Sequence, residues 1–286
     1  MSLEKVCCRV SVEEDEQLQA ALLMEAPELI YIDAASFPAG DYGRLSDLVH
    51  EHGKRIGLRL PAIFRKRAGE YFDAHMAELS EAGFDSILVR SLEGLSYLRE
   101  QERLHEFFEE LSEGKKELIL DHNVYVFNAL TMEALMEITG LSCFGLSLPL
   151  ELSDKELKAL SEKLFKAGCS HTELTVYERA PMMVSAQCVH SLYAGCDRRP
   201  SSEGITDRTG RRLISKNYCD FCYNVIYNSV PTVLYDLGRE LSGIRHQAER
   251  FEFTTESAEE VREILSASYH FPENGFTRAW FRKGTM

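Results

Sequence analysis

The chain has 286 residues, of which 44% are hydrophobic and 27% are charged, and its formal net charge is −14. This length suits one large hydrophobic core, and single α/β barrels are often about this long. The acidic balance argues against general nucleic-acid affinity, because counterion release needs clustered Lys and Arg, and we expect no DNA partner. No apolar run reaches the ~18 residues of a membrane span and no signal peptide is visible, so we expect a cytoplasmic protein without a membrane partner.

Short β-branched and apolar runs alternate along the chain with amphipathic stretches of helical period. The predicted strands cover residues 7–12, 29–34, 55–61, 86–91, 117–122, 143–148, 172–177 and 250–253. A predicted helix follows each strand except the seventh, which leads into a cysteine-rich stretch. In the last unit we expect Thr254 and Thr255 to cap the helix. The alternation is typical of repeated βα units around a parallel sheet.

Eight such units predict a closed α/β barrel of the (β/α)8 TIM type, formed as one domain over residues 1–286. Glycines at the ends of predicted helices agree with this division of the chain: Gly53, Gly83, Gly140 and Gly168. The cysteine-rich insertion, about residues 179–228, then follows strand seven at the face where barrels place active sites. An open doubly wound sheet is the alternative, although no G-x-G-x-x-G follows the first strand.

Four cysteines in the insertion follow the spacing C-x7-C-x22-C-x2-C: Cys188, Cys196, Cys219 and Cys222. Two pairs joined by a flexible polar loop are what four-thiolate binding of a metal ion or an iron–sulfur cluster requires. The alternative is that some are ordinary buried thiols, as we expect for Cys7, Cys8, Cys143 and Cys169. We predict that the four converge on one centre at the barrel mouth, beside the ends of strands five and seven.

Several segments resemble the C-terminal portion of the peptidase U32 family, the collagenase-like peptidases. The resemblance is carried by ELTVYERAPMMVSAQC, YCDFCYNVIYNSVP, RFEFTTE and FTRAWFRKG, and more loosely by RIGLRLPAIFR and ILDHNVYVFN. Some members of the family are collagen-degrading proteases. Others act in hydroxylation of a tRNA uridine, a ribosomal-RNA cytidine or ubiquinone precursors, and hold a [4Fe–4S] cluster on four cysteines. Because long members carry a further barrel upstream, the resemblance implies either a compact member or the C-terminal half of a longer protein.

The resemblance implies that the four cysteines hold a [4Fe–4S] cluster, and zinc is the alternative cofactor. A four-cysteine zinc site is coordinatively closed, so it would be structural. The sequence has neither the H-E-x-x-H of a zinc protease nor the G-x-S-x-G of a serine hydrolase. A Ser–His pair could still form from distant loops, for example Ser185 with His122 or His171.

Polar side chains near the predicted strand ends are candidates for a ligand site at the barrel mouth. We expect a substrate-binding ring from Arg59, Arg65, Arg90, Asp121, His122, Asn123, Glu173, Tyr177 and Arg179, with Asn128 nearby. Guanidinium groups in such a ring could hold a carboxylate or a phosphate in bidentate pairs. The alternative for each of these residues is an internal ion pair or a strand-end hydrogen bond.

Three functions of different classes are compatible with these observations. The first is an iron–sulfur-dependent factor that hydroxylates an RNA base or a related ring. The second is a peptidase that acts on collagen-like or other protein chains. The third is a non-catalytic domain in which zinc fixes a long loop and the surface binds a partner, such as the upstream barrel of a longer chain.

Overall fold

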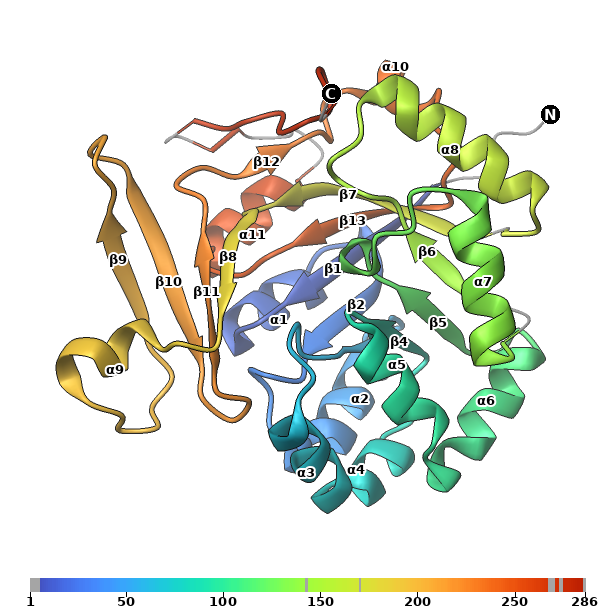
Figure 1. The fold of residues 1–286 in the computed structure, drawn as a ribbon, viewed down its shortest axis with the longest axis horizontal. Coiled ribbons are helices and arrows are strands. Elements are labelled where there is room, and N and C mark those ends of the chain that lie inside the picture. Colours follow the sequence, from blue (N-terminus) through green and yellow to red (C-terminus); the bar gives the residue numbers. More distant parts are fainter. Residues whose placement is uncertain (1–5, 142–143, 170, 267–270, 273–274, 285–286) are drawn as a thin grey trace.

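Eight parallel strands form a closed barrel in the computed structural model, which describes residues 6–141, 144–169, 171–266, 271–272 and 275–284 (Figure 1). The strands are β1 (Cys7–Val12), β2 (Pro27–Asp33), β3 (Arg55–Arg59), β4 (Ser86–Val89), β5 (Glu117–Leu120), β6 (Gly145–Ser147), β7 (Thr172–Glu178) and β13 (Ala248–Glu252). The ring closes because β6 pairs with β7 and β13 pairs with both β7 and β1. The predicted (β/α)8 barrel is therefore confirmed.

Helices cover the outside of the barrel. They are α1 (Asp15–Leu22), α2 (Tyr42–Glu51), α3 (Lys66–Ala74), α4 (Met76–Glu81), α5 (Leu92–Arg99), α6 (His105–Ser112), α7 (Ala129–Thr139), α8 (Asp154–Lys166) and α11 (Ala258–Leu265). Alternate strand residues such as Val10, Ile30 and Ile56 pack outward against buried helix residues such as Leu18 and Val49 in one continuous core. Three 3-10 turns interrupt the loops at η1 (Ala39–Asp41), η2 (Glu102–Leu104) and η3 (His122–Val124).

The helix ends follow local sequence rules. The glycines that we expected to end helices all have positive φ, and Gly140 caps α7 in the left-handed conformation, which glycine adopts without a Cβ clash. The prediction that Thr254 and Thr255 cap the last helix is wrong. Ser257 is the cap, in a reciprocal capping box with Glu260. The two threonines instead donate backbone N–H groups to Glu256 Oε2 as the chain leaves the barrel.

The insertion after β7 folds as a second, four-stranded antiparallel sheet rather than as a flexible polar loop. Its strand order is β8 (Pro181–Ser185), β11 (Tyr223–Tyr227), β10 (Arg212–Tyr218) and β9 (Ser202–Thr206), and α9 (Val189–Ala194) connects β8 to β9. We call β8 to β11 the excursion sheet. It stands at the end of the barrel toward which β1 and β13 point (Figure 1). The sequence pattern hid it because polar residues interrupt the apolar runs, as in SEGIT of β9 and RLISKNY of β10.

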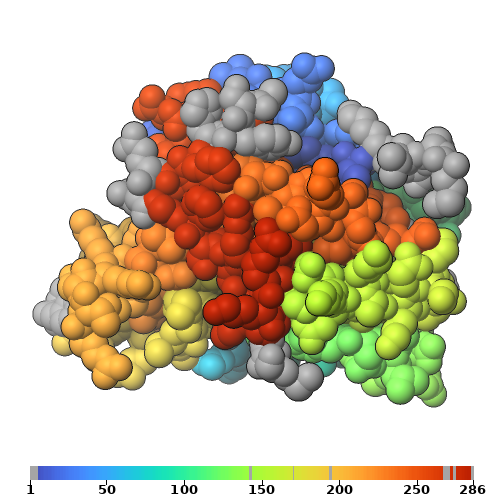
Figure 2. Space-filling model, turned by 90° about the horizontal axis from the view of Figure 1, so that it is seen from above, coloured from blue at the N-terminus to red at the C-terminus, as the bar shows by residue number. Residues whose placement is uncertain are grey.

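The chain returns to the barrel through β12 (Thr232–Val233), which pairs antiparallel with the end of β7, and through α10 (Gly238–Leu241). The C-terminal segment lies between the excursion sheet and α8 (Figure 2). It is held there by the backbone hydrogen bond from Asp154 to Phe281 and by the ion pair of Arg278 with Asp236. Among the described residues, no helix is long and apolar enough to cross a membrane.

Candidate functional site: the barrel mouth and the cysteine turn

The inside of this barrel is mostly charged, although barrel interiors are usually filled by branched apolar side chains. A small apolar cluster, Leu29, Tyr31, Leu88 and Ile119, occupies part of the interior. Gly57 makes room for it, since a Cβ there would lie 2.4 Å from the ring of Tyr31. Ion pairs and hydroxyl groups fill the remaining inward positions. The barrel therefore offers polar chemistry on its inner face, with the apolar core left to the layer beneath the helices.

Arg250, on β13, lies at the centre of this network and is fully buried. Its guanidinium pairs with Asp121 and Glu173, and it donates to Ser147 Oγ at 3.0 Å and to Glu252 Oε2 at 3.3 Å. These partners come from β6, β7, β13 and the residue directly after β5. Because paired charges in a low-dielectric interior interact strongly, Arg250 ties four barrel segments together.

Arg59, the last residue of β3, makes a second buried set of ion pairs. It lies 3.0 Å from Glu252 Oε1, 3.1 Å from Asp33 Oδ2 and 3.2 Å from Glu13 Oε1. It also donates to Ser11 Oγ at 2.6 Å. Arg59 and Arg250 thus share Glu252, which links the two sets across the barrel.

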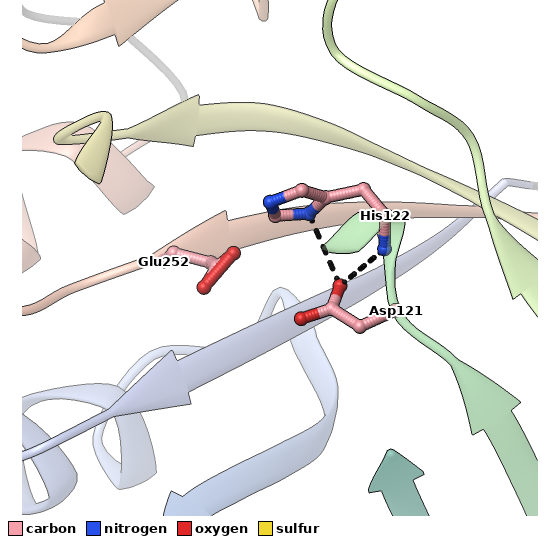
Figure 3. Close-up of side chains that lie close together, drawn as sticks. All are labelled: Asp121, His122 and Glu252. Carbon is pink, nitrogen blue, oxygen red and sulfur yellow. Dashed lines mark hydrogen bonds and ion pairs between the residues drawn. The ribbon is translucent and has the colours of Figure 1, made fainter. Parts of the chain in front are cut away.

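His122 and Asp121 follow β5 and lie together at the mouth (Figure 3). Asp121 Oδ1 accepts the backbone N–H of His122 at 2.9 Å and lies 3.1 Å from ring nitrogen Nδ1. Burial alone would raise the pKa of Asp121, but Arg250 and His122 hold it well below its usual range. Burial would lower the pKa of His122, and the charge of Asp121 outweighs this and raises it. The pair is therefore an imidazole oriented by a carboxylate.

Two other carboxyl groups at the mouth are disfavoured as anions. Burial raises the pKa of Glu178 to about 7, and burial raises that of Asp33 to about 6 although Arg59 opposes the shift. Asp33 Oδ2 lies 3.7 Å from Arg90 Nη1, and Arg90 Nε is 3.5 Å from Asp121 Oδ2. Glu178 makes no side-chain hydrogen bond or ion pair with the described residues. The mouth therefore contains one buried carboxyl group that protein contacts leave unmatched.

Tyrosines of the excursion sheet close the mouth. Tyr218 OH donates to Glu13 Oε2 at 2.6 Å and shares a 2.7 Å hydrogen bond with Tyr227 OH. Tyr223 OH accepts the backbone N–H of Ala62 at 3.4 Å, and Tyr223 stacks on Tyr218 with ring centroids 4.9 Å apart. Figure 1 shows the sheet at this end of the barrel. The barrel mouth, where we expected a substrate-binding ring, is therefore covered by tyrosines of the excursion sheet.

A cavity of about 10 Å³ remains beneath this cover, and we call it the mouth chamber. It is lined by Arg59, Arg90, His122, Glu178, Arg179, Pro181, Tyr227, Glu252 and Thr254. This volume holds about one water molecule or one ion. The chamber is thus polar, small and closed by residues of the excursion.

The predicted substrate-binding ring is only partly assembled. Arg59, Arg90, His122 and Arg179 line the mouth chamber with Asp121 beside it, whereas Glu173 lies deeper and pairs with Arg250. The remaining predicted residues lie elsewhere: Arg65 is exposed before α3, Asn123 is half-buried in η3, Asn128 caps α7, and Tyr177 packs against Phe253 and donates to Glu256.

Residues that the sequence analysis missed complete the network: Glu13, Asp33, Glu178, Arg250 and Glu252. A signal for some of them was present. Parallel strands buried on both faces usually read as continuous apolar runs. Here R-x-S-x-E at residues 9–13 and R-x-E at residues 250–252 place polar side chains at every second position. In a parallel strand, that period indicates a polar barrel interior.

The four cysteines of the insertion lie around one end of the excursion sheet. Cys219 and Cys222 belong to the tight turn between β10 and β11, which we call the cysteine turn (residues 219–222), and the N–H of Cys222 donates to the carbonyl of Cys219 at 3.3 Å. Burial raises the pKa of Cys219, and the neighbouring Cys188 and Cys196 raise it further. These two thiols, distant in sequence, therefore lie within electrostatic range of Cys219.

The separation of the thiols is wider than a single ion requires. Within the described part of the chain, no three of these sulfurs lie within 4.8 Å of one another. Four thiolates at about 2.3 Å from one zinc ion would be closer together than that. Convergence of all four sulfurs on one centre stays a prediction. Of the other cysteines, Cys169 is buried, Cys7 and Cys8 are half-buried, and Cys143 lies outside the described residues.

The expected position of the cysteines beside strands five and seven needs correction. Phe221, inside the cysteine turn, stacks on Phe72 of α3 at 5.9 Å and contacts Tyr71 at 5.1 Å, centroid to centroid. After β7 the chain forms the excursion sheet, and the β10–β11 hairpin of this sheet crosses the mouth. The turn of the hairpin therefore lies over the third βα unit, β3 and α3. The aromatic contacts of Phe221 anchor it there.

The Ser–His pairs considered for a peptidase are not formed. Ser185 Oγ accepts the backbone N–H of Gln187 at 3.0 Å. His122 is enclosed at the mouth with Asp121, and His171, just before β7, lies 3.7 Å from Glu117. Among the described residues, neither histidine forms a hydrogen bond with Ser185, so these groups provide no assembled nucleophile.

A second and larger cavity, about 1290 Å³, lies between the excursion sheet, α11 and the C-terminal segment. Its lining includes Arg179, Arg211 and Arg212, and the rings of Phe271 and Phe276. These two rings stack with centroids 5.2 Å apart and are 48% and 39% exposed. The cavity is therefore large enough for a polymer segment and combines guanidinium groups with exposed rings.

Comparison with known proteins gives no family assignment. No family model and no curated protein matches this sequence. Solved structures with a similar chain path include an L-ribulose 3-epimerase, with 12% identity, 94% of this chain and 90% of that chain covered, and a TM-score of 0.42. An uncharacterized B. cereus protein has 10% identity, coverage of 93% and 66%, and a TM-score of 0.45. The deoxyribose phosphate aldolase from Aeropyrum pernix has 8% identity, coverage of 60% and 75%, and a TM-score of 0.40. Such low values carry no argument about function.

Proposed function

We propose that this chain is an iron–sulfur protein of the U32 type that supports hydroxylation of an RNA base or a related ring. The observation that carries the proposal is the pairing of β8 with β11, Ser185 opposite Asn224, which places Cys188 at the same end of the excursion sheet as Cys219 and Cys222. Cys196 also lies within electrostatic range of Cys219. These thiols are partly or fully exposed, so a cluster could be inserted without unfolding the barrel. When bound, the cluster would supply electron transfer.

The thiol spacing supports a cluster more than a zinc ion. A cluster distributes its four thiolates over several iron atoms, so it accepts sulfurs that lie further apart than those around one ion. The absence of any three of these sulfurs within 4.8 Å, among described residues, fits that requirement. Zinc binding would need the α9 region and the cysteine turn to move closer together.

The large cavity supports RNA as the substrate. Arginines of β10 and the loop before it can pair with phosphates, and exposed aromatic rings provide stacking surfaces for unpaired bases. Arg211 and Arg212 line the cavity together with the rings of Phe271 and Phe276, and Glu203 of β9 also lines it. The wall formed by α11 is acidic, so the phosphates would follow the β10 side.

The test is metal and sulfide analysis of protein purified without oxygen. We expect about four iron and four sulfide per chain, with absorbance near 400 nm. Cys219→Ser should lose the cluster, because one thiolate is missing, whereas the matched control Cys7→Ser should keep it. Colourless wild-type protein with one zinc would favour the zinc-stapled domain instead.

Activity requires a separate measurement. RNA from cells lacking the protein should lose one hydroxylated base, and wild-type protein should restore it where Cys219→Ser does not. Hydrolysis of gelatin by folded, cluster-free protein, together with an unchanged RNA modification profile, would contradict the hydroxylation proposal and support a peptidase.

A further inference from the structure

We propose that the mouth chamber binds one divalent transition-metal ion through His122, Glu178 and Glu252, with Asp121 as the positioning residue for the histidine. This site is separate from the cysteines and does not depend on the function proposed for them. It is built from barrel-strand ends, whereas the thiols belong to the excursion.

The chamber brings suitable ligands together. One ligand atom each from Asp121, His122 and Glu252 lie within 4.8 Å of one another, and all three residues are buried (Figure 3). Glu178 lies outside this group of three, and it lines the same cavity of about 10 Å³ as His122 and Glu252. The space is therefore of the size of one ion, and each of its three lining ligands is at least nine-tenths buried.

The histidine is already held as a ligand would be. Metal-binding histidines usually donate one ring N–H to a carboxylate and use the other nitrogen for the metal. Nδ1 of His122 lies 3.1 Å from Asp121 Oδ1, and Arg250 in turn pairs with Asp121. No hydrogen bond of Nε2 to any described residue competes for that nitrogen. This arrangement assigns Asp121 to orientation and leaves Nε2 for an ion.

Glu178 is the independent observation that points to a ligand. Its side chain is buried, with 5% of the residue exposed, and it lines the chamber without a hydrogen bond or ion pair among the described residues. Buried carboxylates normally have partners, because burying an unpaired one costs several kcal/mol of folding free energy. A bound cation would supply the missing partner.

The charges around the chamber also leave room for a cation. Four carboxyl groups surround it and three guanidinium groups face them: Asp33, Asp121, Glu178 and Glu252 against Arg59, Arg90 and Arg250. A fourth guanidinium, that of Arg179, also lines the chamber and pairs with Glu256. The further partners of these arginines have cations of their own, since Glu13 pairs with Lys216 and Glu173 with Arg9. When His122 is neutral, as a metal-binding histidine must be, the unmatched negative charge belongs to Glu178.

The ligand chemistry selects the class of ion. One imidazole nitrogen and two carboxylate groups suit Mn²⁺, Fe²⁺ or Zn²⁺ better than Ca²⁺ or Mg²⁺, which prefer oxygen alone. Thiolates select softer ions, so Mn²⁺ distinguishes the chamber from the cysteines. Mn²⁺ is therefore the probe of choice.

The experiment is a titration of chelator-stripped, full-length protein with Mn²⁺, followed by electron paramagnetic resonance. Because the excursion sheet covers the chamber, the protein is first incubated with Mn²⁺ a few degrees below its melting temperature. We expect one ion per chain, with nitrogen hyperfine coupling from one imidazole. His122→Gln should lose that coupling, and Glu178→Gln should weaken binding at least tenfold.

Control variants separate this site from other effects. Glu259→Gln, on the exposed surface of α11, and Cys219→Ser should bind Mn²⁺ as the wild type does. Asp121→Asn should weaken binding about 10- to 100-fold while keeping the nitrogen coupling, as expected of a positioning residue. A wild-type protein that binds no Mn²⁺ after the warm incubation overturns the proposal. Equal affinity in His122→Gln and Glu178→Gln overturns it as well.

Discussion

Around the barrel mouth, guanidinium and carboxyl groups are buried and mostly paired, whereas two of the four thiols of the excursion, Cys196 and Cys222, are exposed. The mouth is fixed by strand ends from every side of a closed barrel. Cys219 and Cys222 belong to a turn, and Cys188 and Cys196 flank the short helix α9. Both elements are joined to strands of the excursion sheet alone. The mouth is therefore preorganised by its own ion pairs, and we propose that a bound centre holds the cysteines together.

This difference has a thermodynamic consequence. Removing one partner from a buried ion-pair network leaves an uncompensated charge, which is strongly destabilising. Removing an exposed thiol changes little in the folded protein, because water already solvates it. The comparison predicts that mouth substitutions act on stability and thiol substitutions act on the bound centre.

The largest expected effect is that of Arg250→Met. The change leaves Asp121, Glu173 and Glu252 without their shared cation, so we expect a loss of about 3–5 kcal/mol in the free energy of unfolding. Urea denaturation measures it. The control is Arg282→Ala, whose ion pair with Glu240 is half exposed and should contribute less than about 1 kcal/mol. Equal losses in the two variants would mean that the buried network is not what stabilises the mouth.

The next effect is a pH dependence caused by Glu178. Burial raises its pKa to about 7 from the usual 4.5, so the folded state binds the proton more tightly than the unfolded state. This tighter proton binding stabilises the folded state fully below pH 4.5, and the stabilisation is lost as the pH rises through 7. The corresponding decrease in the free energy of unfolding is at most about 3 kcal/mol. Glu178→Gln cannot ionise, so metal-free variant protein should be the more stable one at pH 8. Parallel stability curves for variant and wild type between pH 4.5 and 8 would sink this prediction.

A smaller effect is expected at the contact between the two regions. Tyr218→Phe removes the hydroxyl that donates to Glu13 and bonds Tyr227, at a cost of about 1–3 kcal/mol. Hydrogen exchange should show faster opening of β10 and β11 with the barrel strands unchanged. Tyr125→Phe, on an exposed side chain, is the control. Uniform acceleration over the whole barrel would show that the excursion sheet does not open by itself.

The smallest effect on stability is expected for Cys222→Ser. This thiol is exposed, and its backbone already has positive φ, which serine tolerates as well as cysteine does. Cluster-free variant and wild type should agree within about 0.5 kcal/mol, while the variant should fail to assemble the centre. A large loss of stability without cluster would show that the cysteine turn is a structural element in its own right.

The strand and helix pattern was readable because each βα unit carries its own local signals. The prediction of residues 7–12 as a strand agrees with β1, and the glycines that end helices adopt positive φ as expected. Ser257 as the last cap was missed because two threonines nearby offered the same local chemistry. Local rules identify candidates of this kind, and the path of the chain out of the barrel selects among them.

The sequence by itself determined the eight-unit barrel, the place of the insertion and the set of four thiols, because hydrophobic period, capping residues and cysteine spacing are properties of neighbouring residues. Only the tertiary structure decided that Arg250 pairs with Asp121 and Glu173, that Glu178 has no hydrogen bond or ion pair among the residues the structure describes, and that tyrosines of the excursion cover the mouth. These contacts join residues that are far apart in the sequence: Arg250 and Asp121 are separated by 129 positions. Closure of the barrel sets them, and no local pattern encodes which charges will face one another across it.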